Sequence, residues 1–341
     1  MSELAAILMP AAIAFAVTAL LGFVMIPWLR KLHFGQTILD IGPRWHKSKQ
    51  GTPTMGGLLF IIGTAAAVIV TYVTDRLTGG NIMANGSLTS GQENVKLFAG
   101  LCLALCFAGV GFLDDYIKVV KKRNLGLTVR QKTVIQLFII IAYLGTLYMS
   151  GSSYLFIPFV GNIELGLWMF PLGICVIYAA INAVNFTDGI DGLCGTVSFV
   201  ATLFFLIAAG ITGYFGQGLL SAALAGGVAG FLVWNFNPAK VFMGDTGSLF
   251  LGGMVVALAY GLDCPIILVL VGIIYVVEGF SDVLQITYFK LTHGKRIFKM
   301  APIHHHFEMC GWSEKKIVGV FSFINIIGCA AGVALMYFGR V

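Results

Sequence analysis

Long apolar segments separated by shorter polar ones run along the whole chain. A helix needs about 20 mostly apolar residues to span a bilayer, and ten segments come close to that length. They predict an all-α polytopic membrane protein that forms one domain over residues 1–341. The ten expected transmembrane helices are 4–28, 57–74, 95–113, 134–150, 167–185, 193–213, 218–236, 247–262, 265–289 and 316–338.

The composition supports a membrane environment. Hydrophobic residues make up 58% of the chain and charged residues only 11%, where soluble domains carry roughly 25% charged residues. The first apolar run, 4–28, exceeds the core of about 7–15 residues in a cleavable signal peptide, so we expect it to remain as a helix. The seven cysteines show no metal-binding spacing and are expected to be unpaired.

The basic residues fall on one side of the expected helices. The loops 29–56, 114–133, 186–192, 237–246 and 290–315, with the adjoining helix ends, hold 18 of the 21 Lys and Arg residues. Only Arg76, Lys96 and Arg340 lie on the other side. The positive-inside rule makes these loops cytoplasmic and puts both termini on the outer side. The net charge of +6 therefore indicates topology, and no nucleic-acid partner is expected.

The outer loops carry few chemical signals. Tyr154–Trp168 has β-type residues around the turn 160–162, which predicts a small outer β-hairpin. No internal repeat and no separate soluble domain is evident. The sequence leaves the oligomeric state open, and a homodimer is compatible with it.

The segment Asn182–Leu193, NAVNFTDGIDGL, separates two apolar runs and contains two Asn and two Asp. Asp188 and Asp191 are three residues apart, so they share one face at a helix start. A polar turn with a capping Asp would explain one of these carboxylates. Charges at membrane depth are costly and indicate function.

Two further acidic clusters lie at the same boundary. Asp114 and Asp115 end the third expected helix, and adjacent carboxylates repel each other unless a cation compensates. They are either hydrated side chains of a loop or functional groups. In the second case both bind Mg²⁺, or they supply a catalytic base, or one binds Mg²⁺ and the other is the base. Asp245 lies between glycines before the eighth expected helix, where backbone can approach a ligand closely and a helix N-terminus can meet phosphate.

Three other polar groups complete the cytoplasmic set. Gly51–Gly57, GTPTMGG, is either an ordinary proline turn or an anion-receptive helix start. The second group shares one helical face, which must look into the bundle or into a wet cavity; it consists of Glu278, Ser281, Asp282 and Gln285. The third group is the three consecutive histidines His304, His305 and His306. Neighbouring side chains diverge on a helix, so these histidines favour recognition of phosphate or carboxylate over binding of one shared metal ion.

Together these clusters favour phosphoryl transfer. Mg²⁺ prefers a few carboxylates together with water and substrate phosphate, and such enzymes contribute position and electrostatics. A secondary transporter, with acidic groups as proton relays, is the rival from another class. The five boundary carboxylates are Asp114, Asp115, Asp188, Asp191 and Asp245.

The motifs GTPTMGG, FLDDYIK, NAVNFTDGIDGL, NPAKVFMGDTGSL and PIHHHFE, in this order, resemble those of phospho-N-acetylmuramoyl-pentapeptide transferases. These enzymes belong to the polyprenyl-phosphate N-acetylhexosamine-1-phosphate transferase family. The resemblance extends from Gly51 to Glu308, and HHHFE favours the muramoyl-pentapeptide branch over relatives that use UDP-GlcNAc. It implies ten helices in the bacterial inner (plasma) membrane and a Mg²⁺-containing cleft that opens to the cytoplasm. It also implies transfer of phospho-MurNAc-pentapeptide from UDP-MurNAc-pentapeptide to undecaprenyl phosphate, giving lipid I and UMP.

The resemblance also implies roles for individual residues. Asp245 is the metal ligand, with Asp114 as a second ligand, and Asp114 and Asp115 are the catalytic pair. Asp191 and Phe242 meet the uracil. Lys118 and Lys132 face phosphates, and Lys118 also belongs to the catalytic residues. Lys49 is assigned the same role on a less distinctive match. The remaining substrate-site residues are Thr54, Asn182, Asn185, Asp188, Asn235, Gly244, Ser248, Gln285, His304, His305 and His306.

The chemistry of the substrates suggests a direct mechanism. The lipid phosphate is already a nucleophile, so it can attack the β-phosphate of the UDP-sugar in line while Mg²⁺ offsets the diphosphate charge. Asp114 or Asp115 would remove a proton from the lipid phosphate. A covalent phospho-aspartyl route is the chemical alternative.

Overall fold

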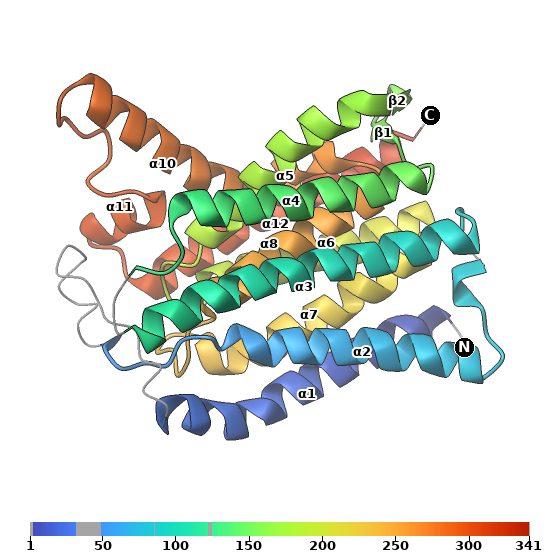
Figure 1. The fold of residues 1–341 in the computed structure, drawn as a ribbon, viewed down its shortest axis with the longest axis horizontal. Helices are drawn as coiled ribbons and strands as arrows, with labels where there is room; N and C mark the ends of the chain where they lie inside the picture. Colours follow the sequence, from blue (N-terminus) through green and yellow to red (C-terminus); the bar gives the residue numbers. More distant parts are fainter. Residues whose placement is uncertain (1–2, 32–48, 85, 122–124, 341) are drawn as a thin grey trace.

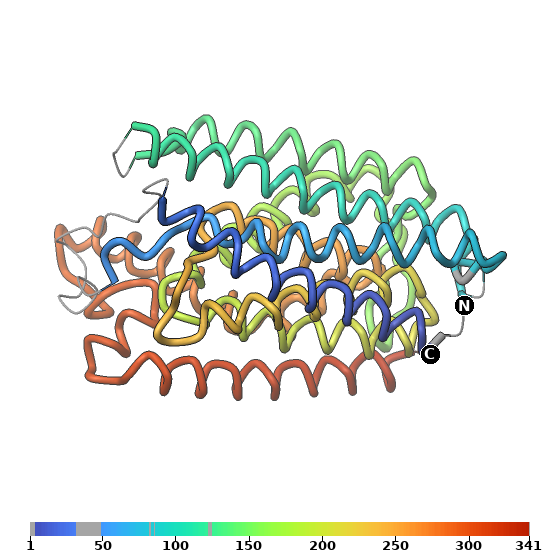
Figure 2. Tube along the Cα trace, turned by 90° about the horizontal axis from the view of Figure 1, so that it is seen from below, coloured from blue at the N-terminus to red at the C-terminus, as the bar shows by residue number. Residues whose placement is uncertain are grey.

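The computed structural model describes residues 3–31, 49–84, 86–121 and 125–340, most of them in helices. The long helices run roughly along the longest axis of the molecule (Figure 1), and α1 begins at the end where α12 finishes (Figure 2). The elements are α1 (Glu3–Lys31), α2 (Gly57–Leu77), η2 (Ile82–Ala84), α3 (Ser90–Val120), α4 (Val129–Met149), β1 (Tyr154–Ile157), β2 (Gly161–Glu164), η3 (Gly166–Trp168), α5 (Met169–Phe186), α6 (Leu193–Thr212), α7 (Phe215–Asn235), α8 (Gly244–Gly261), η4 (Pro265–Ile267), α9 (Leu268–Val271), α10 (Ile273–Leu291), α11 (Ile303–Met309) and α12 (Glu314–Phe338).

Eight helices within the described ranges are long and apolar enough to cross a bilayer, against the ten expected. They are α1 to α7 and α12. A ninth span is formed if η4 and α9 are joined to α10 across a bend of 85°. The expected helix 247–262 lies on α8, which is not in this set because its first turn, Gly-Asp-Thr-Gly-Ser, is polar.

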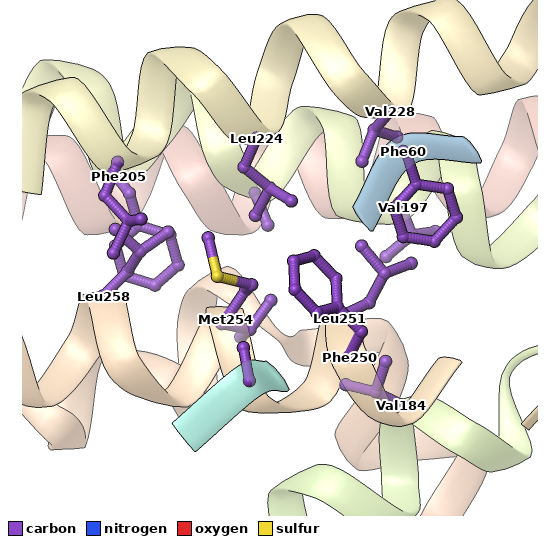
Figure 3. Packing of buried hydrophobic residues seen from close by; sticks show 14 of the residues in the cluster. Phe60, Val184, Val197, Phe205, Leu224, Val228, Phe250, Leu251, Met254 and Leu258 are labelled. Atoms are coloured by element: carbon purple, nitrogen blue, oxygen red, sulfur yellow. The ribbon is translucent and has the colours of Figure 1, made fainter. Parts of the chain in front are cut away.

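Helix α8 is the centre of the bundle. All its residues from Thr246 to Gly261 are buried, and it packs against α2, α3 and α5. Figure 3 shows Phe250, Leu251 and Met254 among side chains of the surrounding helices, and the Phe60 and Phe250 rings lie 5.9 Å apart. A helix enclosed by other helices needs no lipid-facing surface. Its polar first turn can therefore serve a site at one end of the bundle.

The exterior of the bundle is apolar. Large hydrophobic side chains such as Phe23, Phe138 and Phe323 are more than 60% exposed. Water would not tolerate so much apolar surface on a monomer, whereas bilayer hydrocarbon does. The described chain is therefore a multi-pass membrane protein.

The expected hairpin is confirmed. Strands β1 and β2 pair antiparallel, with Tyr154 opposite Glu164 and Ile157 opposite Gly161. The hairpin is attached to the bundle through Asp263, whose carbonyl accepts from the Phe156 amide at 2.7 Å. The buried Asp263 carboxylate pairs with Lys96 and accepts from the Tyr154 hydroxyl at 3.1 Å.

Replacing Lys96 with Met should destabilise this attachment. The substitution leaves the Asp263 carboxylate buried without its cation, which typically costs about 3–5 kcal/mol. We expect the unfolding temperature of the detergent-purified protein to fall, and the double variant Lys96→Met/Asp263→Asn to recover most of the loss. An unchanged unfolding temperature in the single variant would contradict a stabilising role for the pair.

Candidate active site

Three carboxylates from distant parts of the sequence converge at one end of the bundle. Asp114 and Asp115 lie near the end of α3, and Asp245 lies in the first turn of α8. One ligand oxygen from each lies within 4.8 Å of the other two. The two motifs FLDDYIK and MGDTGSL therefore form a single acidic site.

Asp115 joins the two helices. Its carboxylate accepts from the Thr246 amide at 2.9 Å, the Thr246 hydroxyl at 2.7 Å and the Asp245 amide at 3.3 Å. First-turn amides have no partner within their own helix, and negative charge is favourable beside them. Asp115 therefore caps α8 and holds Asp245 in place.

Gly244 makes this close approach possible. Its φ of +69° is unfavourable for residues with a side chain. A Cβ atom there would lie 2.5 Å from Asp115 Oδ2 and 2.7 Å from Thr54 Oγ1. The close neighbours of Gly244 are side chains of the protein itself, and the expected approach of its backbone to a ligand stays a prediction.

Two lysines and an amide surround the acidic cluster. Lys118 Nζ lies 2.6 Å from Asp114 Oδ2 and 3.0 Å from Asp245 Oδ2. Lys132 Nζ lies 3.1 Å from the same Asp245 oxygen. Asn185 donates to Asp245 Oδ1 at 3.0 Å. Burial alone would raise the pKa of Asp245, but Lys132 and Lys118 hold it well below its usual range, so this carboxylate stays ionised.

Asp188 lies close enough to the cluster to feel its charge. Burial raises the pKa of Asp188 to about 8, and the negative charges of Asp245, Asp115 and Asp191 add to the effect. A cation or a ligand donor beside this group would favour its ionised form. Asp188 therefore belongs electrostatically to the same site.

The donor set fits Mg²⁺. The three converging carboxylates supply hard oxygen atoms, which are the ligands that Mg²⁺ prefers. Lys118 already places a positive charge among them. Asp115 accepts three hydrogen bonds from the first turn of α8, so Asp245 and Asp114 are the carboxylates that could hold a metal ion, as the resemblance implies.

The motif GTPTMGG lies against the segment before α8. Phe242 donates its amide to the Pro53 carbonyl at 2.8 Å, and its own carbonyl accepts from the Gly56 amide at 2.8 Å. Gly57 donates in the same way to the Met243 carbonyl at 3.0 Å. This pairing brings Thr54 and Phe242 beside the acidic cluster.

Lys49 and Asp191 form an ion pair at 2.7 Å. Asp191 also accepts from Asn237 at 3.3 Å, and Lys49 contacts Glu314 at 2.6 Å. Sequence reasoning missed Asn237 and Glu314. Asn237 stands in the NPAK part of a motif, but Glu314 begins the last helix and carries no local signal.

Asn182, Asn235 and Gln285 are occupied by contacts within the protein. Asn182 donates to Gln136 and to the Tyr178 carbonyl. Asn235 bonds the Gly192 amide and the Val241 carbonyl. The Gln285 side chain bonds three backbone groups at residues 297 and 298. These bonds give each residue a role in holding segments together, while Ser248 bonds Asn185 beside the cluster.

The three histidines take three different partners. His304 Nδ1 lies 2.9 Å from Glu278 Oε2, and both side chains are fully buried. His305 Nδ1 lies 2.6 Å from Glu308 Oε2, and His306 accepts from the Lys299 amide at 3.1 Å. The expectation that these side chains diverge is wrong for His304 and His305, whose ring centroids lie 4.1 Å apart, although each ring has its own partner. The sequence placed Glu278 on a face that looks either into the bundle or into a wet cavity; the side chain is buried in the bundle, and its pairing with His304 was missed.

A hollow lies along α10. Its volume is about 430 Å³, and it is bounded by α10 and the segment that leads to α11. Figure 1 shows both helices at the end of the molecule where α3 finishes and α4 begins. Its lining combines apolar and charged side chains, namely Asp282, Gln285, Ile286, Phe289, Lys290, Arg296, Met300 and Ala301.

Comparison with known proteins decides the family. Residues 49–61 match the phospho-N-acetylmuramoyl-pentapeptide-transferase signature 1, and residues 97–263 match the glycosyl transferase family 4. A phospho-N-acetylmuramoyl-pentapeptide-transferase of Clostridium botulinum (strain Alaska E43 / Type E3) is 44% identical over 93% of each chain. The chain belongs to the phospho-N-acetylmuramoyl-pentapeptide transferase family. An enzyme of the same name in Clostridium perfringens (strain SM101 / Type A) is 45% identical over 95% of this chain and 94% of its own. The one in Acetivibrio thermocellus is 43% identical over 94% of this chain and 92% of its own.

In this transferase, Gly189 should not tolerate a side chain. A Cβ atom there would overlap the imidazole of His304, so Gly189→Ala must displace either the ring or the turn that carries Asp188. We expect kcat/KM for phosphosugar transfer to fall about tenfold, because a small displacement of positioning groups is costly. Gly319→Ala is the matched control, since a Cβ there meets no atom within 4 Å. Equal rates for both variants would contradict this placement of His304.

Proposed function

We propose that the chain transfers phospho-MurNAc-pentapeptide from UDP-MurNAc-pentapeptide to undecaprenyl phosphate, giving lipid I and UMP. The carrying observation is the convergence of Asp114, Asp115 and Asp245. Lys118 and Lys132, which contact Asp245, supply the positive charge that a diphosphate requires. Relatives that carry the transferase name are 42–45% identical over most of the chain, which supports the choice of substrates.

The reaction is a direct displacement at phosphorus. An oxygen of the lipid phosphate attacks the β-phosphorus of the UDP-sugar, and the bond from that phosphorus to the bridging oxygen breaks. UMP leaves with the electron pair. Lys118 and Lys132 bind the phosphate oxygens and offset their charge. Asp245 and Asp114 would hold a Mg²⁺ ion, which would supply Lewis-acid stabilisation of the diphosphate.

Asp114 is the base that removes a proton from the lipid phosphate. Its partner Asp115 uses both oxygens to cap α8, so it acts by holding Asp245. Asp114 contacts Lys118 and the Leu127 amide and faces the centre of the site. Phosphosugar trapped covalently on the protein without lipid acceptor would overturn direct attack in favour of a phospho-aspartyl intermediate.

The uridine nucleotide binds at the turn between α5 and α6. Asp191 accepts from the base, and Phe242 meets the same base. Two observations support these roles of Asp191 and Phe242. The segments 53–57 and 242–243 pair through backbone hydrogen bonds, and Lys49 forms an ion pair with Asp191. His305 and His306 line the sugar-peptide side of the site, and His304, which is buried against Glu278, holds the segment that carries them.

The site faces the cytoplasm of a bacterial inner membrane, and both termini face outward. The support is the excess of Lys and Arg on one side of the expected spans. Among the described residues, Lys49, Lys118 and Lys132 lie at the end of the bundle that carries the acidic site. Cytoplasmic UDP-sugars then reach the site without crossing the bilayer.

Release of UMP by the detergent-purified protein tests the proposed function. We expect UMP and lipid I from UDP-MurNAc-pentapeptide and a short polyprenyl phosphate, and no comparable rate with UDP-GlcNAc. A preference for UDP-GlcNAc would assign the chain to the GlcNAc-1-phosphate branch. A transporter requires a sealed compartment, so absence of UMP in detergent would favour that class.

A further inference from the structure

Four polar side chains form a closed ring behind the turn that carries Asp191. Lys49 Nζ lies 2.7 Å from Asp191 Oδ1 and 2.6 Å from Glu314 Oε1. Asn237 Nδ2 lies 3.3 Å from Asp191 Oδ2 and 3.1 Å from Glu314 Oε2. Each of the two donors thus bridges both carboxylates, and we call this set the Glu314 ring.

The Glu314 ring joins four segments that are far apart in sequence. Lys49 precedes α2, Asp191 lies in the turn between α5 and α6, Asn237 follows α7, and Glu314 begins α12. Two backbone amides add to it. The Asp191 amide donates to Glu314 Oε2 at 3.3 Å, and the Ala239 amide donates to Asp191 Oδ2 at 2.9 Å.

Most of the ring is withdrawn from water. The side chains of Asp191, Glu314 and Lys49 are 2%, 12% and 19% exposed. Charge-assisted hydrogen bonds are stronger in such surroundings than at a wet surface. Glu314 is also favourably placed at the N-terminus of α12, where the helix dipole stabilises negative charge.

The contacts leave the two Asp191 oxygens unequal. Oδ2 accepts from Asn237 and from the Ala239 amide, whereas Oδ1 bonds Lys49. A carboxylate oxygen can accept two hydrogen bonds. Oδ1 is therefore the oxygen best able to accept a further donor from a ligand, and the ring sets the direction in which it points.

We propose that Glu314 is a positioning residue for the nucleotide of the donor, an inference that rests on the proposed function. It acts through Lys49, Asn237 and the Asp191 amide and does not itself contact the nucleotide. Binding of a uridine nucleotide thereby depends on the first turn of α12, a helix that contributes no residue to the acidic cluster. Removing Glu314 leaves Lys49 and Asp191 as a neutral pair, so the fold is retained while the turn loses its anchor.

The test compares Glu314→Ala and Glu314→Gln with Lys315→Ala, an exposed control on the same helix. We expect Glu314→Ala to weaken UMP binding, measured calorimetrically, and to raise KM for UDP-MurNAc-pentapeptide about tenfold, with kcat within about twofold. Glu314→Gln keeps an acceptor oxygen and should recover KM to within about threefold of wild type. Lys315→Ala and the unfolding temperatures should match wild type.

Three other results would overturn the inference. Unchanged KM and UMP affinity in Glu314→Ala would show that the ring does not orient Asp191. A fall in kcat together with the unfolding temperature, without rescue by Gln, would show that Glu314 serves only the fold. If the wild-type protein neither binds UMP nor releases it, the proposed function fails and this inference fails with it.

Discussion

Replacing Asp245 with Asn should lower the rate of phosphosugar transfer on the order of a thousandfold. The carboxylate contacts Lys118 and Lys132, accepts from Asn185 and completes the acidic cluster. An amide is a poor ligand for Mg²⁺ and leaves two ammonium groups without their shared anion. The turnover measured as UMP release should therefore collapse, while the similar size of Asn preserves packing.

Glu164→Gln is the matched control for this substitution. Glu164 is an exposed acid on β2, so its neutralisation should leave turnover unchanged. Thermal unfolding and gel filtration in detergent should be the same for both variants. A wild-type rate in Asp245→Asn would remove Asp245 from the catalytic site.

The neighbouring acids Asp114 and Asp115 should respond differently to the same substitution. In Asp114→Asn the group that accepts the proton is lost, and we expect turnover to fall at least about a hundredfold, the lower range for general-base catalysis, with no change in unfolding temperature. In Asp115→Asn an amide NH₂ faces backbone donors at the start of α8. An unmade buried hydrogen bond costs about 1–3 kcal/mol, so this variant should also unfold at a lower temperature.

Measuring turnover and unfolding for both variants separates the two roles. Equal losses of activity and stability in the two would contradict the assignment of Asp114 to chemistry and Asp115 to positioning. A fully active Asp114→Asn would exclude Asp114 as the base and leave the proton to solvent.

Hydrophobic patterning predicted the fold well, because lipid requires long apolar helices whatever their packing. The hairpin at Tyr154–Ile157 and Gly161–Glu164 was also readable, since β-type residues flank a turn. The expected number of spans failed at α8. Because other helices enclose it, Gly244–Gly261 can begin with a polar turn. The length of its apolar segment therefore does not predict its place in the bundle.

The acidic cluster was predictable from sequence because charges at membrane depth are costly and therefore stand out. Its internal arrangement was not. The division of labour between Asp114 and Asp115 depends on which carboxylate faces the first turn of α8. Glu278 and Glu314 meet their partners across 26 and 265 residues, pairings set by helix packing.

Binding of Mn²⁺, a paramagnetic substitute for Mg²⁺, tests most directly whether the separated acidic turns hold a metal ion against the diphosphate. Electron paramagnetic resonance of the wild-type protein with UDP-MurNAc-pentapeptide should show one bound Mn²⁺ per chain, displaced by Mg²⁺ and lost in Asp245→Asn. Equal Mn²⁺ binding by the wild-type protein and Asp245→Asn, or none in either, would contradict the account.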